Sequence, residues 1–244
     1  MRDKFSSLWQ KYFGKAEMPI YFYFTDEPNG IDIVATSKEH VCLIATLHKV
    51  RKGKAIAFGK DSFGCFGGKK FFGFSSDIRP GFEHFLSCGI PGQIEGERYK
   101  KNPEIVKAWQ MKAPTFQAPK QFIAFKPWAQ LEESERPEAV IFFAPADVLS
   151  ALFTLAGFAE SDPNSVIAPF SAGCSSIVTY PYIEERSDHP RSILGMFDVT
   201  ARPCVESGIL SFAIPFSKFT TIVNDMEESF LITDSWKKVY KRLI

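Results

Sequence analysis

Two short segments carry the residue types best suited to chemistry, and both contain the dipeptide Gly-Cys. The first reads Gly64-Cys65-Phe66-Gly67-Gly68-Lys69, and the second contains Gly173-Cys174. Glycines let the backbone amides of a turn approach a ligand closely, and a neighbouring lysine can pair with phosphate or carboxylate. The pattern predicts a small anionic ligand or cofactor, of unknown identity, bound by Gly64, Gly67, Gly68, Lys69 and Gly173.

Because each turn also contains a thiol, the site could carry out a reaction on the ligand as well as bind it. A thiol at a helix N-terminus is expected to have a lowered pKa, because backbone N–H groups and the helix dipole favour the thiolate. Cys65 and Cys174 are therefore the candidate catalytic residues, as nucleophile or redox thiol, if the protein is an enzyme. Arg202 is a further candidate ligand-binding residue, because a guanidinium matches carboxylate and phosphate. Substrate and reaction class stay open.

Two alternatives compete with this interpretation. Thiolates also ligate metals and iron–sulfur clusters, and Cys42, Cys65 and Cys174 form the natural trio for a metal-binding redox protein. The chain has no Cys-x-x-Cys pair, and a buried cysteine is also a common small apolar core residue. The second alternative is a non-catalytic interaction module, whose phenylalanine-rich surface would bind a partner, since the chain has 25 Phe.

The net charge and the apolar runs of the chain argue against nucleic acid and membranes as partners. The chain has 29 Lys+Arg against 28 Asp+Glu, a net charge of +1, which argues against a protein that coats nucleic acid. The apolar run from Ala139 to Ala159 is interrupted by Pro145 and Asp147, so we expect a strand and a helix there and no membrane span. The first residues lack the apolar region of a signal peptide, which favours a cytoplasmic location. The oligomeric state stays open.

The elements around the two turns follow a similar order. In the first half, we expect a strand at Ile20–Phe24, a helix that begins at the capping box Thr36–Glu39, and a strand at Lys54–Phe58. In the second half, we expect a strand at Ala139–Ala144, a helix that ends at Gly157, and a strand at Ser165–Pro169. A Gly-Cys turn follows the last strand of each half.

This order predicts an α/β or α+β fold, with a mixed sheet built from two weakly related β-α-β-α units in one globular body. We expect one domain over residues 1–244, with an internal duplication of about residues 18–112 and 137–230. The duplication matches Ala55–Phe58 with Val166–Pro169 and Cys65 with Cys174. Ligand sites form beyond the carboxyl ends of strands in such sheets, so both cysteines should border one cleft.

The order of several motifs resembles the DUF169 family, also called ArCR. The motifs of the first half are the segment around Cys42, Arg51-Lys-Gly-Lys-Ala and the Gly64–Gly68 turn. Those of the second half are Val140-Ile-Phe-Phe-Ala-Pro, Gly173-Cys174, Tyr180-Pro-Tyr, Leu194-Gly-Met and Ile214-Pro-Phe-Ser-Lys. The chain has Cys65-Phe66-Gly67-Gly68 where the family often has Cys-Pro-Gly-Gly. The resemblance extends from about Met18 to Met226 and implies no particular reaction.

Overall fold

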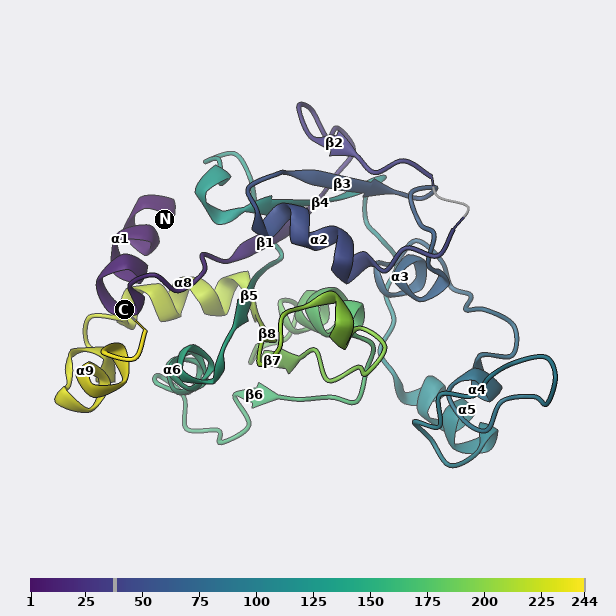
Figure 1. Ribbon diagram of the computed structural model, residues 1–244. Helices are drawn as coiled ribbons and strands as arrows, with labels where there is room; N and C mark the ends of the chain where they lie inside the picture. Colours follow the sequence, from purple (N-terminus) through teal and green to yellow (C-terminus); the bar gives the residue numbers. More distant parts are fainter. Residues whose placement is uncertain (37–38, 244) are drawn as a thin grey trace.

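The computed structural model describes residues 1–36 and 39–243 and has an α/β fold (Figure 1). Its strands are β1 (Ile20–Thr25), β2 (Asp32–Ile33), β3 (Ile56–Gly59), β4 (Phe122–Pro127), β5 (Ala139–Ala144), β6 (Val166–Ile167), β7 (Ser192–Gly195) and β8 (Leu210–Pro215). Its α-helices are α1 (Arg2–Phe13), α2 (Leu43–Arg51), α3 (Phe66–Phe71), α4 (Phe82–Phe85), α5 (Pro103–Lys112), α6 (Ala146–Ala156), α7 (Tyr180–Glu184), α8 (Phe216–Asp225) and α9 (Asp234–Tyr240). A π-helical segment, η2 (Ser175–Thr179), leads into α7, and single 3-10 turns are η1 (Trp128–Gln130), η3 (Arg202–Cys204) and η4 (Phe230–Ile232).

The described strands form one mixed sheet in the order β2-β3-β4-β1-β5-β8-β7-β6. β1 and β5 pair antiparallel at the centre, with Ile20 opposite Ile141 and Phe22 opposite Ala139. Outward from this pair, β4 and β3 follow antiparallel on one side, as β8 and β7 do on the other. The two edge strands, β2 and β6, each pair parallel with their neighbour. The predicted mixed sheet is confirmed.

Helices cover both faces of the sheet, so the central strands are buried on both sides. β5 alternates between two cores, with Val140 and Phe142 on one face and Ile141 and Phe143 on the other. This explains its uninterrupted apolar sequence, which is typical of a strand covered on both faces. The first core lies under α1, α6, α8 and α9, and the second lies under α2, η2 and α7.

The two halves of the sheet have matching topology. The sequence β1-β2-β3-β4 and the sequence β5-β6-β7-β8 occupy equivalent positions on either side of the centre. In each half a helical crossover joins the edge strand to the next strand: α2 in the first half, and η2 with α7 in the second. These positions equate β3 with β7 and Cys42, at the start of α2, with Cys174, before η2. The sequence had instead matched Ala55–Phe58 with Val166–Pro169 and Cys65 with Cys174, so this pairing is wrong. Descent of the halves from a duplicated unit stays a prediction.

The crossover helix α2 begins later than the capping pattern indicated. Its N-cap is Cys42, with extended backbone, and its first helical residue is Leu43. Part of the capping box Thr36–Glu39, namely Ser37 and Lys38, lies outside the described residues. The helix still ends where Gly53 adopts a positive φ of 102°.

The halves differ in the connection that follows their third strand. Between β3 and β4 the chain forms α3 and then the α4–α5 segment, which we define as residues 74–118. This segment extends away from the sheet beside α3 (Figure 1). Asn102 caps α5 by accepting a hydrogen bond from the N–H of Ile105 at 2.9 Å. The corresponding connection between β7 and β8 contains only η3 and the turns around it.

Candidate functional site

A cavity of about 610 Å³ lies where both crossovers, α3 and the α4–α5 segment meet. Both halves contribute to it, the first through the starts of α2 and α3 and the second through the turn that precedes η2. Most of its surface is aromatic or aliphatic. The aromatic lining residues are Phe66, Phe71, Phe82, Phe85, Tyr99, Trp109, Phe170 and Phe197.

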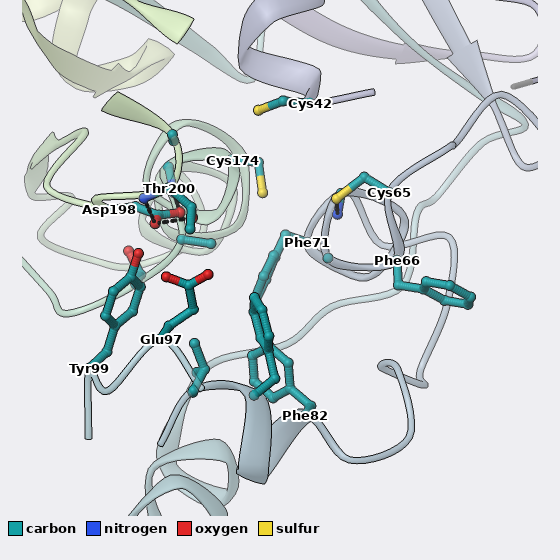
Figure 2. A pocket seen from close by; sticks show the side chains of 18 of the residues that line it. Cys42, Cys65, Phe66, Phe71, Phe82, Glu97, Tyr99, Cys174, Asp198 and Thr200 are labelled. Carbon is teal, nitrogen blue, oxygen red and sulfur yellow. Dashed lines mark hydrogen bonds between the residues drawn. The ribbon is translucent and has the colours of Figure 1, made fainter. Parts of the chain in front are cut away.

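Three cysteines border this cavity, each at the N-terminus of a helical element. Cys42 caps α2, Cys65 caps α3 and Cys174 precedes η2. Figure 2 shows the three side chains gathered at one end of the pocket, above Phe71 and Phe82. Cys65 and Cys174 therefore share one cleft in the structure, as the position of both turns after strands had led us to expect.

The expectation of a lowered pKa is wrong for both cysteines. Burial raises the pKa of Cys65, although the N–H of Gly68, 3.4 Å from its Sγ, opposes that rise. Burial also raises the pKa of Cys174, and the nearby thiol of Cys65 and carboxylate of Asp198 add to the rise. In this apolar pocket, loss of water around a thiolate outweighs the stabilisation that helix amides provide.

Cys204 joins this group from outside the pocket. It ends η3 and packs beside Cys42 in the second core. Burial raises the pKa of Cys204 to about 11, with a further contribution from the adjacent Cys42 thiol. Cys88, by contrast, is exposed.

Asp198 connects the turn at Gly173 with the loop after β7. Its Oδ2 accepts a hydrogen bond from the N–H of Gly173 at 3.2 Å. Its Oδ1 accepts from the N–H and the hydroxyl of Thr200, at 3.1 and 2.7 Å. The carboxylate of Asp198 thus accepts the hydrogen bond from the Gly173 amide that an anionic ligand had been expected to accept.

The loop that carries Asp198 begins with a strained residue. Met196 is buried with a φ of 67°, a left-handed conformation that a residue with a long side chain rarely adopts. Its Sδ would lie 3.0 Å from a Cβ at Gly173, so the glycine permits the close approach of the loop to the turn. Strain of this kind is concentrated at functional sites, which agrees with its position beside the pocket.

Comparison with known proteins gives a family and no activity. The model of the DUF169 family, described as the uncharacterised ArCR, matches residues 11–225. The chain belongs to this family. No curated protein and no solved structure has a significant match to the chain. Assignment to DUF169 therefore confirms the resemblance, and any function must be argued from the pocket itself.

The DUF169 pocket contains some of the predicted ligand residues and leaves out others. Gly67, Gly68 and Gly173 line it together with the three cysteines, whereas Gly64, Lys69 and Arg202 do not. The guanidinium of Arg202 instead donates to the backbone carbonyls of Ile209 and Glu206, so its observed role is structural.

The metal site of the alternative interpretation is not formed by the residues that the structure describes. Within residues 1–36 and 39–243, no group of three or more His, Cys, Asp or Glu side chains is arranged to hold a metal ion. Cys42, Cys65 and Cys174 border one pocket, but they do not converge as a ligand set. Nor does any helix in these residues have the length and apolar character needed to cross a membrane.

Sequence reasoning missed the other wall of the pocket. Glu97 and Tyr99 come from the α4–α5 segment, and Asp198 and Thr200 come from the loop after β7. Neither segment has a motif of recognised spacing. The sequence does show an acidic residue followed two positions later by a hydroxyl residue, in Glu97-Arg-Tyr99 and in Asp198-Val-Thr200. Such a pattern is too common to predict a site unless the fold is known.

Proposed function

We propose that this protein binds a small, largely apolar organic molecule in the pocket between its two halves. The observation that carries the proposal is the cavity of about 610 Å³ with its aromatic lining. Pockets of about 300–1,000 Å³ with mainly apolar walls and a few polar groups are typical of small-molecule sites. The position agrees with the rule that ligands bind beyond strand ends, between matching halves of an α/β sheet.

The thiols act in this proposal as part of the binding wall. With pKa values raised by burial, Cys65 and Cys174 are protonated at neutral pH and present polarisable, weakly polar sulfur to a ligand. Thiol catalysis would need a group that removes the proton after the ligand binds. The structure does not favour an anionic ligand, because Lys69 and Arg202 lie outside the pocket. The Gly173 amide is also unavailable to such a ligand, since it donates to Asp198.

A pocket-filling variant tests the proposal. A Cβ at Gly67 would meet Phe71 at 3.6 Å and the Sγ of Cys65 at 3.8 Å, which are ordinary contacts, so a side chain fits there. Gly67→Trp should fill the end of the pocket near the cysteines and weaken binding of the probe 1-naphthalenemethanol at least tenfold. Lys69→Trp places the same side chain on the same helix outside the pocket and serves as the control. Ligand-observed NMR titration gives both affinities.

Two outcomes would overturn the proposal. One is that no naphthalene probe binds the wild-type protein, and the other is that Gly67→Trp binds it as well as Lys69→Trp does. Protection gives an independent measurement: bound 1-naphthalenemethanol should slow alkylation of Cys65 and leave alkylation of the exposed Cys88 unchanged.

A second candidate function comes from the mouth of the pocket. Phe66, Phe170, Phe197 and Val199 line it with exposed fractions of 64%, 46%, 55% and 64%. Exposed apolar residues that cluster in this way mark protein-binding surfaces. Under this second proposal a partner inserts an apolar segment, so peptides selected from a display library should bind and be displaced by 1-naphthalenemethanol. Selection of no such peptide counts against it.

We also propose a cytoplasmic location. All five cysteines, each within the described residues, are free thiols, and this supports a reducing compartment.

A further inference from the structure

One wall of the pocket presents only oxygen atoms as its polar groups. Glu97 and Tyr99 approach from the α4–α5 segment, while Asp198 and Thr200 approach from the loop after β7. Figure 2 shows the four side chains together on one side of Phe71 and Phe82, away from Cys65. The wall therefore combines two carboxylates with a phenol and an alcohol.

The hydrogen bonds within this wall leave acceptors for a ligand. Oδ1 of Asp198 already accepts two hydrogen bonds from Thr200, whereas Oδ2 accepts one from Gly173 and keeps a second lone pair. Among the described residues, the hydroxyl oxygen of Tyr99 is buried and makes no hydrogen bond of normal geometry, although Thr200 lies close to it. A buried, unpartnered polar atom is costly, so a group that bonds to Tyr99 would recover free energy on binding.

The basic side chains near the pocket lie away from the wall formed by Glu97, Tyr99, Asp198 and Thr200. Arg79 is an exposed lining residue whose guanidinium lies 5.6 Å from the ring centre of Phe85, and His40 lines the pocket from the exposed segment before α2. Arg98 and Lys100 flank Tyr99 in sequence but do not line the cavity, and Lys100 lies 3.8 Å from the ring centre of Phe170. Among the described residues, neither Glu97 nor Asp198 forms an ion pair.

We infer, on the basis of the proposed binding function, that the ligand is a cationic amine with a flat apolar body. The body lies between the aromatic side chains, and the ammonium group donates to Glu97, Asp198 and Tyr99. An ammonium has three N–H donors and no acceptor, so it complements a wall of carboxylate and hydroxyl oxygens. Aromatic side chains add a favourable interaction with the cation at their faces.

A matched series of probes tests the charge of the ligand. The probes 1-naphthylmethylamine, 1-naphthalenemethanol and 1-naphthoate share one ring system and differ in their polar group. The wild-type protein should bind the amine at least tenfold more tightly than the carboxylate, with the alcohol between them. Ligand-observed NMR titration at pH 7 measures the three affinities.

Single substitutions then test which side chains cause the tighter binding of the amine. Glu97→Gln should reduce the amine-to-alcohol affinity ratio at least threefold, while Glu95→Gln, an exposed neighbour outside the pocket, should leave it unchanged. Tyr99→Phe should weaken binding of both amine and alcohol without lowering the melting temperature, because the deleted hydroxyl makes no hydrogen bond of normal geometry within the protein. These two variants leave the contacts of Asp198 to Gly173 and Thr200 intact.

The outcomes separate this inference from the proposed function. Equal affinity for the three probes, tighter binding of the carboxylate, or an unchanged ratio in Glu97→Gln would overturn the inference and leave small-molecule binding in place. Failure of every probe to bind would overturn the proposed function itself.

Discussion

The thiols of Cys65 and Cys174 occupy the position that usually activates a cysteine, but their environment reverses the effect. A helix amide contacts Cys65, yet burial raises its pKa, because the pocket removes water from the thiolate. The place of each cysteine at a helix N-terminus thus determines how the helix dipole acts on its thiol. Access of water to the thiol determines whether it is protonated. Only the second of these depends on the rest of the fold.

The first prediction concerns the reactivity of these thiols with iodoacetamide. Because their pKa values are raised above the ordinary value of 9.0, alkylation of Cys65 and Cys174 should accelerate as pH rises beyond 9. At pH 7 both should react more slowly than the exposed Cys88, as followed by peptide mass spectrometry. Rapid alkylation of Cys65 at pH 7 would contradict this protonation state.

The second prediction distinguishes two adjacent glycines of α3. A Cβ at Gly68 would lie 2.3 Å from Cδ1 of the buried Leu43, so Gly68→Ala should destabilise the fold by about 1–3 kcal/mol through overpacking. A Cβ at Gly67 meets only ordinary contacts, and Gly67→Ala should stabilise by up to about 1 kcal/mol through helix propensity. Denaturant unfolding measures both, and equal effects would argue against close packing of α3 on α2.

At the scale of elements, a buried ionic cluster joins β4 to the turn that precedes β5. Nζ of Lys126 lies 2.6 Å from Glu135 and 2.9 Å from Glu132. The hydroxyl of Tyr21, on β1, donates to Glu135 at 2.5 Å. The side chains of Lys126 and Glu135 are only 6% and 9% exposed, so neither charge can rely on water if its partner is removed.

The third prediction follows from this cluster. Glu135→Gln should destabilise the protein at pH 7 by about 3 kcal/mol, because Lys126 loses its most buried counter-charge. Although burial opposes it, contact with Lys126 and Tyr21 lowers the pKa of Glu135 below its ordinary value of 4.5. Its stabilisation is therefore fully present above pH 4.5 and is lost as pH falls through the lower, folded-state pKa.

Denaturant unfolding of wild type and Glu135→Gln at several pH values provides the measurement. The difference in unfolding free energy should be constant at neutral pH and shrink below pH 4.5. A difference that persists unchanged at pH 3 would show that the carboxylate does not contribute through its charge. Glu133→Gln, an exposed neighbour in the same acidic run, is the control.

At the scale of the whole molecule, the halves are inseparable despite their matching topology. Each core contains residues from both halves, such as Tyr21 with Phe142 in the first and Phe22 with Ile141 in the second. Arg51 adds a polar connection from α2, because its guanidinium contacts Glu17 and, across the halves, Glu206 at 2.8 Å. It also lies 4.8 Å from the ring centre of Phe143 on β5.

The fourth prediction is a single cooperative unfolding transition. Since neither half retains a complete core alone, both should unfold together. Tryptophan fluorescence reports the first core through Trp9 and Trp128, and access of a thiol reagent to Cys174 reports the second. Coincident transitions are expected, with far-UV circular dichroism as the global measurement, whereas separated midpoints would indicate that the two cores unfold independently.

Much of the fold could be predicted from local sequence. The apolar run at Ala139–Ala144 is β5, and the helix predicted to end at Gly157 is α6. Such predictions succeed because apolar periodicity and helix caps depend on interactions over only a few residues. The pairing of strands could not be inferred in the same way: β3 lies between β2 and β4, and equating it with β7 requires the complete sheet.

For the candidate site, the sequence alone determined which residues could react, and the tertiary structure decided which of them meet. Spacing identified Cys65 and Cys174 at turns into helices, and both border the pocket. The aromatic walls, the oxygen wall of Glu97 and Asp198, and the exclusion of Arg202 depend on segments far apart in the chain. Burial decided the protonation state of the thiols as well, because desolvation is a property of everything packed around a group and not of its neighbours in sequence.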